Sequence, residues 1–388
     1  MSAMSSPLPL DGVTVVDFTQ VYMGPCATQM LADYGADVIK IERPGAGDLS
    51  RTSFPGDPAG LLGPVFCALN RNKRSVALDL RKPEMRDAVA RLIDRADVVV
   101  NNFRAGVMER MGFGYEDLAK RNPRLIYAVG TGYGLTGPYA HKGGQDVLAQ
   151  AMSGDMWRRS DPSVPLSVHG TTFADYSAGM HMVQGILLAL LQRQKTGRGQ
   201  QVAVSLLDSM IAAQMQEGTA HLMRGKEVNW SAMPLSGVFE TTDGALVMVG
   251  AFKANPIEDI GRALELPGLA TDTRFLTFAL QVTNRPVLQA IFHERFGQNT
   301  TSHWLARLDA EDLLCAPVRT LAEALADPQT EINGMVLEAP GEIETMRVIG
   351  SPVHLSDSPV AIRIPPASLG RHTGEVLAEL GLAASDAA

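Results

Sequence analysis

Cysteine is scarce in this chain: 388 residues contain only three, Cys26, Cys67 and Cys315. They lie far apart in the sequence and form no CxxC pair. This spacing argues against a disulfide framework and against a cysteine-based zinc site, and it fits a protein from a reducing compartment.

Long hydrophobic runs are also missing. The chain begins MSAMSSPLPLDG, which has no basic region followed by an apolar stretch, so we expect no signal peptide. The longest apolar stretch, Val183–Leu191, is too short to span a bilayer. Together with the few cysteines, these features predict a cytoplasmic protein that does not engage membranes.

The charge balance leans to the acidic side. Lys and Arg number 34 and Asp and Glu number 42, so the net charge is 34 − 42 = −8. This argues against general nucleic-acid binding but leaves room for a local basic pocket that holds an anionic ligand. Hydrophobic residues make up 45% and charged residues 20% of the chain, which is typical of a packed protein, and 388 residues favour two domains.

Strands and helices alternate in the first part of the sequence. Apolar, β-branched runs predict five strands, at Val13–Phe18, Ala36–Glu42, Ser75–Leu80, Asp97–Phe103 and Leu125–Gly130. Helical spacing predicts helices at Cys26–Tyr34, after a break at Gly24-Pro25, and at Pro83–Arg95 and Tyr176–Arg193. The alternation predicts an α/β fold with a mostly parallel sheet, whose ligands gather at the carboxyl ends of the strands.

The second part of the sequence has a different character. We expect a mainly helical segment at Val202–Leu222, and then a hairpin formed by Gly237–Phe239 and Ala245–Val249 around the Asp243-Gly244 turn. Further helices are expected at Pro256–Leu264, Arg285–Phe296 and Thr301–Leu308, which together indicate a smaller α+β domain. Short strand-like runs and a closing helix, Thr373–Leu380, follow.

Gly132–Gly137 matches GxGxxG, but it lies late in the predicted sheet and runs into Pro138, so a loop that allows close backbone approach explains it better than a dinucleotide site. The sequence contains no GxSxG elbow, P-loop or HExxH motif, and we expect no metal site and no prosthetic group.

Asp175 directly precedes the predicted long helix. A helix cap explains this position without chemistry. Alternatively, the helix N-terminus would keep the carboxylate ionised and stabilise an oxyanion beside it.

Basic residues gather near the predicted strand ends and would suit a phosphorylated ligand: Arg43, Arg51, Arg71, Lys73, Arg74, Arg104, Arg110 and Lys142.

A series of segments resembles one family in order and spacing: PLDGVTVVDFTQVYMGP, GADVIKIERPGAGD, LNRNKRSVALDL, ADVVVNNFRAGVMERMG, LIYAVGTGYGLTGPY, GQDVLAQAMSG, FADYSAGMH and KTGRGQQVAVSLLD. The chain resembles the class III CoA-transferases, which include formyl-CoA and carnitine CoA-transferases and α-methylacyl-CoA racemase. The resemblance implies a Rossmann-like large domain built from both chain ends, with a smaller domain inserted. The implied divisions are 1–222, 223–325 and 326–388, in a homodimer of interlocked chains.

The resemblance also implies roles for individual residues. The catalytic aspartate of the family falls on Asp175, in Phe173-Ala-Asp-Tyr-Ser. Coenzyme A would be substrate and product, and the positions that contact it fall on Tyr22, Arg43, Asn72, Arg74, Asn102, Phe103, Arg110 and Lys142. Tyr22 departs from the glutamine of formyl-CoA transferases, which argues against formyl and oxalyl substrates.

Transfer of CoA from an acyl-CoA, for which succinyl-CoA is a common family donor, to a carboxylic acid is therefore the favoured function. A 2-methylacyl-CoA racemase is the nearest alternative, but Gln145 replaces the histidine of that branch and Gly250–Lys253 lacks its glutamate. Neither Gln145 nor Phe252 can exchange the proton that racemisation requires. A nucleotide-dependent oxidoreductase and a non-catalytic CoA-binding subunit remain open as further alternatives.

Overall fold

The computed structural model describes residues 7–52, 62–250, 252–254, 256–341 and 345–383. These residues form two compact units. The first contains 1–155, 168–215 and 328–388, and the second contains 156–167 and 216–327. The second unit thus includes 156–167, a segment that the sequence-based division places in the large domain.

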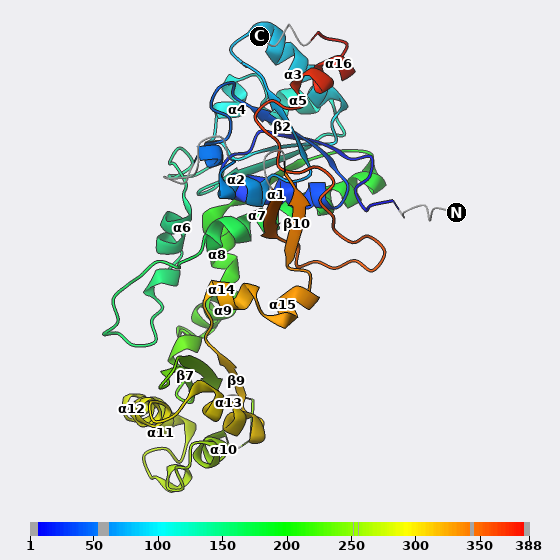
Figure 1. The fold of residues 1–388 in the computed structure, drawn as a ribbon. Coiled ribbons are helices and arrows are strands. Elements are labelled where there is room, and N and C mark those ends of the chain that lie inside the picture. The colour runs from blue at the N-terminus through cyan, green and yellow to red at the C-terminus, as the bar shows by residue number, and fades with distance from the viewer. Residues whose placement is uncertain (1–6, 53–61, 251, 255, 342–344, 384–388) are drawn as a thin grey trace. The chain divides into compact units, whose positions relative to one another are not determined.

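A six-stranded parallel sheet organises the first unit (Figure 1). Its strand order is β3-β2-β1-β4-β5-β6, which is the order of a Rossmann fold. The strands are β1 (Thr14–Asp17), β2 (Asp37–Glu42), β3 (Lys73–Ala77), β4 (Val98–Asn101), β5 (Ile126–Thr131) and β6 (Gln201–Ser205). The predicted α/β class with a parallel sheet is confirmed.

Helices cover both faces of this sheet because both faces are apolar. Val16 packs with residues of α3 (Pro83–Arg95), α5 (Tyr115–Arg121) and α16 (Thr373–Glu379). The next residue back, Val15, points to the other face and packs with α1 (Met23–Asp33) and α7 (Phe173–Thr196). Such alternation along a fully buried strand produces a three-layer sandwich, seen edge-on in Figure 1.

The remaining elements of the first unit are short. A β-hairpin is formed by β10 (Val336–Pro340) and β11 (Thr345–Ile349). Short helices complete the unit: α2 (Pro64–Leu69), α4 (Val107–Arg110), α6 (Asp146–Met152), α8 (Leu206–Ala213) and α15 (Pro328–Ile332). Among the described residues, no helix combines the length and the apolarity needed to cross a bilayer.

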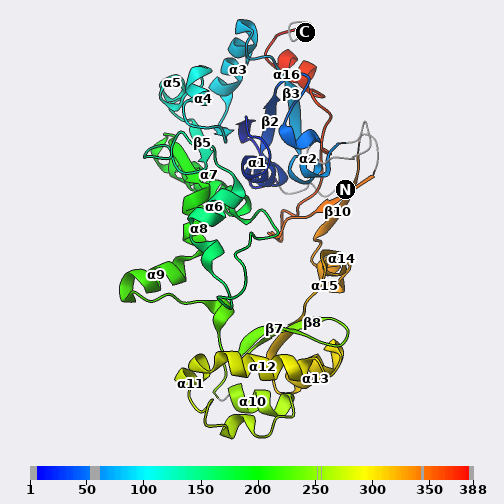
Figure 2. The same cartoon turned by 90° about the vertical axis from the view of Figure 1, so that its left-hand side faces the viewer.

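The second unit is built on a three-stranded antiparallel sheet (Figure 2). It contains β7 (Ser236–Glu240), β8 (Ala245–Val249) and β9 (Leu314–Pro317), packed with α10 (Pro256–Ala263), α11 (Phe278–Thr283), α12 (Arg285–Phe296) and α13 (Thr301–Ala310). The predicted hairpin is confirmed as the β7–β8 pair. Phe239, Phe296 and Trp304 lie at the centre of its core, and the Trp304 indole donates to the Phe296 carbonyl at 2.9 Å. Most of α9 (Met215–Arg224) and all of α14 (Leu321–Leu325) also belong to this unit.

Several predicted boundaries are wrong for physical reasons. The third strand begins at Lys73 instead of Ser75, because Lys73 and Arg74 are buried with their charges paired, which hydrophobicity does not reveal. Gly24 and Pro25 lie inside α1, where a first-turn proline sacrifices no helical hydrogen bond.

Two further segments were misassigned. The segment that begins at Val202 was expected to be helical, but its alternating valines form the edge strand β6 before α8 begins. The long helix begins at Phe173 instead of Tyr176, which places Asp175 inside its first turn.

Candidate active site

The N-terminal ends of α1 and α7 pack against each other. Gly179 of α7 allows this contact, because a Cβ at that position would lie 2.8 Å from the Met23 carbonyl oxygen and 3.6 Å from Cys26 Sγ. Asp175 is the third residue of α7, one turn before Gly179, and Thr172 is the residue before the helix. The predicted helix-cap role of Asp175 is therefore wrong, because Thr172 occupies the cap position.

A second carboxylate lies beside Asp175. The Asp175 backbone N–H donates to Asp146 Oδ2 at 2.9 Å. Burial, and then the charge of Asp146, raise the pKa of Asp175 to about 7. The expectation that the helix N-terminus keeps this group ionised is not met, because the cost of burial and the neighbouring like charge outweigh the helix dipole.

The Asp146 carboxylate is itself held in place. It is buried in the first turn of α6, and its Oδ1 accepts from the Gln150 side chain. Gln150 Oε1 accepts in turn from the His169 backbone N–H at 3.0 Å. The His169 ring contacts Asp155, in the turn after α6, so the segment before α7 is bound both to α6 and to that turn. The orientation of Asp175 therefore depends on a chain of contacts, and the GQD sequence at Gly144–Asp146 was the available signal for it.

Tyr22 reaches the same place from α1. It is the residue before that helix, and its hydroxyl is close enough to the Thr172 side chain to interact with it. Burial raises the pKa of Tyr22, and the nearby Cys26, Asp175 and Tyr176 add to that rise. The structure thus brings Tyr22 and Asp175, two of the residues predicted from sequence, close together.

Cys26 is a neighbour that the sequence-based interpretation did not include. Burial raises the pKa of the Cys26 thiol to about 11, so it is a neutral thiol near pH 7. Neutral thiols are poor nucleophiles. Cys26 is therefore a weak candidate for the nucleophile of this cluster.

Four loops meet at the carboxyl edge of the sheet, because β2, β1, β4 and β5 are adjacent and parallel. Arg43 follows β2, Asn102 and Phe103 follow β4, and Lys142 lies in the loop after β5. Arg110 is the last residue of α4, just beyond the β4 loop.

The cationic side chains on these loops are largely free. Within the described part of the chain, Arg43, Arg104 and Arg110 form no side-chain hydrogen bond or ion pair, and all three are exposed. Lys142 lies over the Tyr139 ring, 4.3 Å from its centroid. These side chains are available to an anionic ligand.

Two predicted CoA contacts have other partners. Asn72 Nδ2 donates to Asp33 at 2.7 Å, and its Oδ1 accepts from the backbone of Arg363 and Ile364. Arg74 forms ion pairs with Asp37, Glu375 and Glu379. Their polar atoms hold chain segments together.

The GxGxxG segment is a backbone crossing. A Cβ on Gly132 would lie 2.4 Å from the Gly144 Cα, and a Cβ on Gly144 would lie 2.3 Å from the Gly132 Cα. The next helix, α6, begins only at Asp146, so the helix that a dinucleotide fingerprint needs is missing from its place. The interpretation as a close-approach loop is confirmed.

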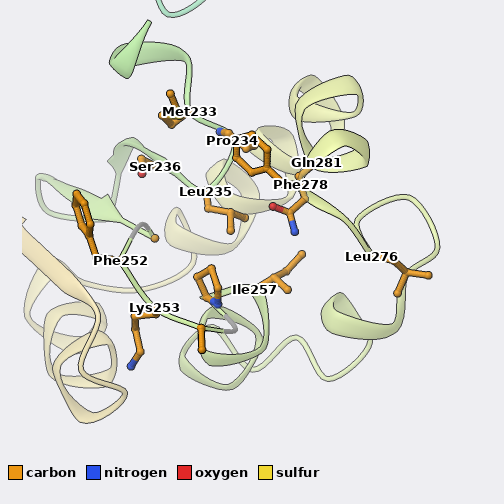
Figure 3. Close-up of a pocket in the computed structure, with 13 residues that line it drawn as sticks. Met233, Pro234, Leu235, Ser236, Phe252, Lys253, Ile257, Leu276, Phe278 and Gln281 are labelled. Carbon is orange, nitrogen blue, oxygen red and sulfur yellow. The ribbon is translucent and has the colours of Figure 1, made fainter. Parts of the chain in front are cut away.

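The second unit contains a cavity of about 350 Å³ (Figure 3). Its wall is mainly apolar, with Leu235, Ile257 and Phe278 among the lining side chains. The ammonium group of Lys253 is engaged elsewhere, with the Glu311 carbonyl and with Asp259. None of the described lining residues is an Asp, Glu or His, so these residues supply no carboxyl or imidazole base for racemisation.

No group of three or more potential metal-binding side chains is found among the described residues. The candidate site contains the partly buried Asp175 carboxyl at the start of α7 and the Asp146 carboxylate that accepts from the Asp175 N–H. Cationic side chains lie on the loops at the carboxyl edge of the sheet.

Comparisons with known proteins agree with this picture. Residues 10–373 match the model of CoA-transferase family III. The succinyl-CoA:glutarate CoA-transferase of Mus musculus is 36% identical over 390 residues, which cover 98% of this chain and 88% of that protein. The succinyl-CoA:mesaconate CoA-transferase of Haloarcula hispanica is 35% identical, and the match covers 96% of each chain.

A solved structure shares the fold. The crystal structure of a CAIB/BAIF family protein from Brucella suis superimposes with a TM-score of 0.86 at 34% identity, over 97% of this chain and 100% of that one. The fold, the cluster around Asp175 and the match over nearly the whole sequence lead to one conclusion: the chain belongs to the family III CoA-transferases, enzymes that act on acyl-CoA thioesters.

Proposed function

We propose that this enzyme transfers CoA from an acyl-CoA, with succinyl-CoA as the first candidate, to a dicarboxylic acid, and that Asp175 is its nucleophile. The observation that carries the proposal is the partly buried Asp175 carboxyl, whose pKa is raised to about 7 beside Asp146 and Tyr22. The substrate class is inferred from relatives named for succinyl-CoA with glutarate or mesaconate.

The first half-reaction forms a covalent intermediate. A carboxylate oxygen of Asp175 attacks the thioester carbonyl, the C–S bond breaks, and CoA leaves as the thiolate. The product is a mixed anhydride between Asp175 and the donor acyl group. The thiolate then attacks the aspartyl carbonyl, which releases the donor as a free carboxylate and leaves an aspartyl-CoA thioester.

The second half-reaction reverses these steps with a new acid. The acceptor carboxylate attacks the aspartyl-CoA carbonyl and displaces the thiolate again. The thiolate attacks the acceptor's carbonyl carbon in the resulting anhydride, and this releases the product acyl-CoA and the Asp175 carboxylate. The net reaction converts one acyl-CoA thioester into another of similar energy, so the cycle needs no ATP.

The surroundings of Asp175 suit these steps. A raised pKa makes a carboxylate more basic, and a more basic carboxylate is the stronger nucleophile once it is ionised. Partial burial limits the access of water, which would hydrolyse the anhydride. The first-turn N–H groups of α7 offer positive potential to the oxyanions that form beside Asp175.

Binding of CoA is assigned to the loops at the carboxyl edge of the sheet. Arg43, Arg110 and Lys142 would meet the phosphates, because guanidinium and ammonium groups are strong phosphate partners. Phe103 and Tyr22 would contact the pantetheine arm and the thioester end. We also propose the interlocked homodimer and the domain divisions that the family resemblance implies.

The test is a panel of acyl-CoA donors against mono- and dicarboxylic acids, with products identified by mass spectrometry. Asp175→Ala should lower kcat for transfer by at least about 10³-fold, while leaving the fold and CoA binding intact. Asp208→Ala is the matched control, because Asp208 is the third residue of α8 just as Asp175 is of α7.

Two outcomes would contradict the proposal. The first is measurable transfer by Asp175→Ala. The second is the absence of any CoA transfer by the wild-type enzyme combined with deuterium incorporation at Cα of a 2-methylacyl-CoA, which would identify a racemase.

A further inference from the structure

The loop between β1 and α1 contains a strained residue. Val21 has φ = +67°, in the left-handed region that β-branched residues avoid. Its side chain is 44% exposed, so burial of apolar surface does not compensate the strain. Other interactions must therefore hold the backbone in this conformation.

Two side chains from neighbouring loops hold it. Asn102, which follows β4, accepts from the Gln20 N–H at 2.9 Å and donates to the Gln20 carbonyl at 2.8 Å. Asp48, which lies beyond β2, accepts from the Val21 N–H at 3.1 Å. Val21 is thus held through its own N–H. Gln20, the residue before it, is held through both its N–H and its carbonyl.

Asp48 is a rigid anchor. It is buried, its Oδ2 lies 2.8 Å from the buried Lys40 ammonium, and Oδ1 also accepts from the backbone and hydroxyl of Ser50. Lys40 in turn donates to the Thr19 carbonyl at 2.7 Å, on the same loop. Three consecutive residues of the loop, Thr19, Gln20 and Val21, are therefore fixed from both sides of β1.

The residue that follows Val21 is Tyr22, whose hydroxyl is close enough to Thr172 and Asp175, at the start of α7, to interact with both. We propose that Asn102 and Asp48 are positioning residues that hold the strained Gln20–Val21 backbone and so place Tyr22 against the start of α7. Asn102 then acts through this loop, since both polar atoms of its amide are already bonded to Gln20. This inference rests on the proposed function only for its kinetic readout.

The kinetic test uses Asn102→Ala. We expect kcat to fall about ten- to a hundredfold, since a displacement near 1 Å at a reacting site has effects of this size, with KM for the acyl-CoA changed less than about threefold. Asn122→Ala is the matched control: Asn122 also bridges backbone groups, those of Ala96 and Arg124, but at the opposite end of the strands. It should leave kcat unchanged.

The second test needs no activity. In the wild-type background, Val21→Gly should raise the melting temperature by a few degrees, because glycine adopts φ = +67° without strain. In the Asn102→Ala background the loop is free to relax, so the same substitution should give no gain. The two residues should therefore be energetically coupled.

Three results would overturn the inference. If Asn102→Ala raises KM for every acyl-CoA and leaves kcat intact, Asn102 is a direct CoA ligand. If Val21→Gly shifts the melting temperature equally in both backgrounds, Asn102 does not hold the strain. If the wild type transfers CoA and Asn102→Ala matches its kcat, the positioning role fails while the proposed function stands.

Discussion

Two sets of cationic side chains in the first compact unit have opposite surroundings. In one set, buried cations face carboxylates: Lys40 lies 2.8 Å from Asp48, and Arg71 lies 2.7 Å from Asp33. In the other set, Arg43, Arg104 and Arg110 are exposed, on loops or at the end of α4, and form no ion pair with any residue that the structure describes. The buried pairs belong to the scaffold, and the unpaired arginines lie at the edge of the sheet to which we assign CoA binding.

The carboxylates divide in the same way. Asp48 is buried, but Lys40 and the backbone of Ser50 and Val21 overcome the effect of burial and lower its pKa to about 2. Asp175 has a carboxylate as its neighbour, so burial and Asp146 together raise its pKa to about 7. The scaffold therefore keeps its charges satisfied, whereas the site retains a carboxyl poised near neutral pH.

The largest expected effect concerns a scaffold cation. Arg71→Met should lower the free energy of unfolding by about 3–5 kcal/mol, because it leaves the buried Asp33 carboxylate without its cationic partner. Denaturant unfolding measures this change. The enzyme that remains folded should keep the wild-type KM for acyl-CoA. A raised KM would show that Arg71 belongs to the binding site as well as to the scaffold.

The second prediction concerns pH. Asp175 has a folded-state pKa of about 7, above its unfolded value, so the folded state loses stability as pH rises from about 4 to 7. Asp175→Asn removes this loss and should gain on the order of 2 kcal/mol at pH 8, with a smaller gain at pH 5. Unfolding curves at the two pH values measure it. An equal difference at both would show that the Asp175 pKa is not raised.

The third prediction concerns Arg74, which the family resemblance makes a CoA contact but which the structure places in ion pairs within the chain. Arg74 is paired with Asp37, Glu375 and Glu379, all partly exposed. Arg74→Gln should therefore cost about 1–2 kcal/mol of stability and leave KM for acyl-CoA within about twofold of wild type. A tenfold rise in KM without a loss of stability would instead make Arg74 a CoA contact.

The smallest expected effect concerns a free cation. Arg43→Ala should raise KM for acyl-CoA about tenfold, equivalent to about 1.4 kcal/mol, with little change in kcat or in stability. Arg198, an exposed arginine in the turn before β6, offers the control substitution Arg198→Ala. Unchanged KM in Arg43→Ala would remove Arg43 from the binding edge.

Much of the fold was predictable from local pattern. The helices Pro83–Arg95 and Arg285–Phe296 were predicted residue for residue, since apolar spacing and a proline in the first turn define them. The start of β3 was missed, because Lys73 and Arg74 are buried through pairing with residues distant in sequence.

The site was predictable only in part. The FADYS motif led to Asp175, and the structure brings Tyr22 to it. The raised Asp175 pKa was missed because it depends first on burial in the folded chain and then on Asp146, which lies 29 residues away in sequence. The strain at Val21 was missed as well, since a backbone angle imposed by tertiary hydrogen bonds leaves no trace in local composition.

The central claim is that the Asp175 carboxyl becomes acylated in every cycle. The direct measurement is to mix the enzyme with succinyl-CoA and a productive acceptor acid, quench with hydroxylamine during turnover, digest, and analyse the peptide containing Asp175 by mass spectrometry. We expect a hydroxamate at Asp175 that requires acyl-CoA and is missing from Asp175→Asn. Product formation with an unmodified Asp175 throughout turnover would contradict it.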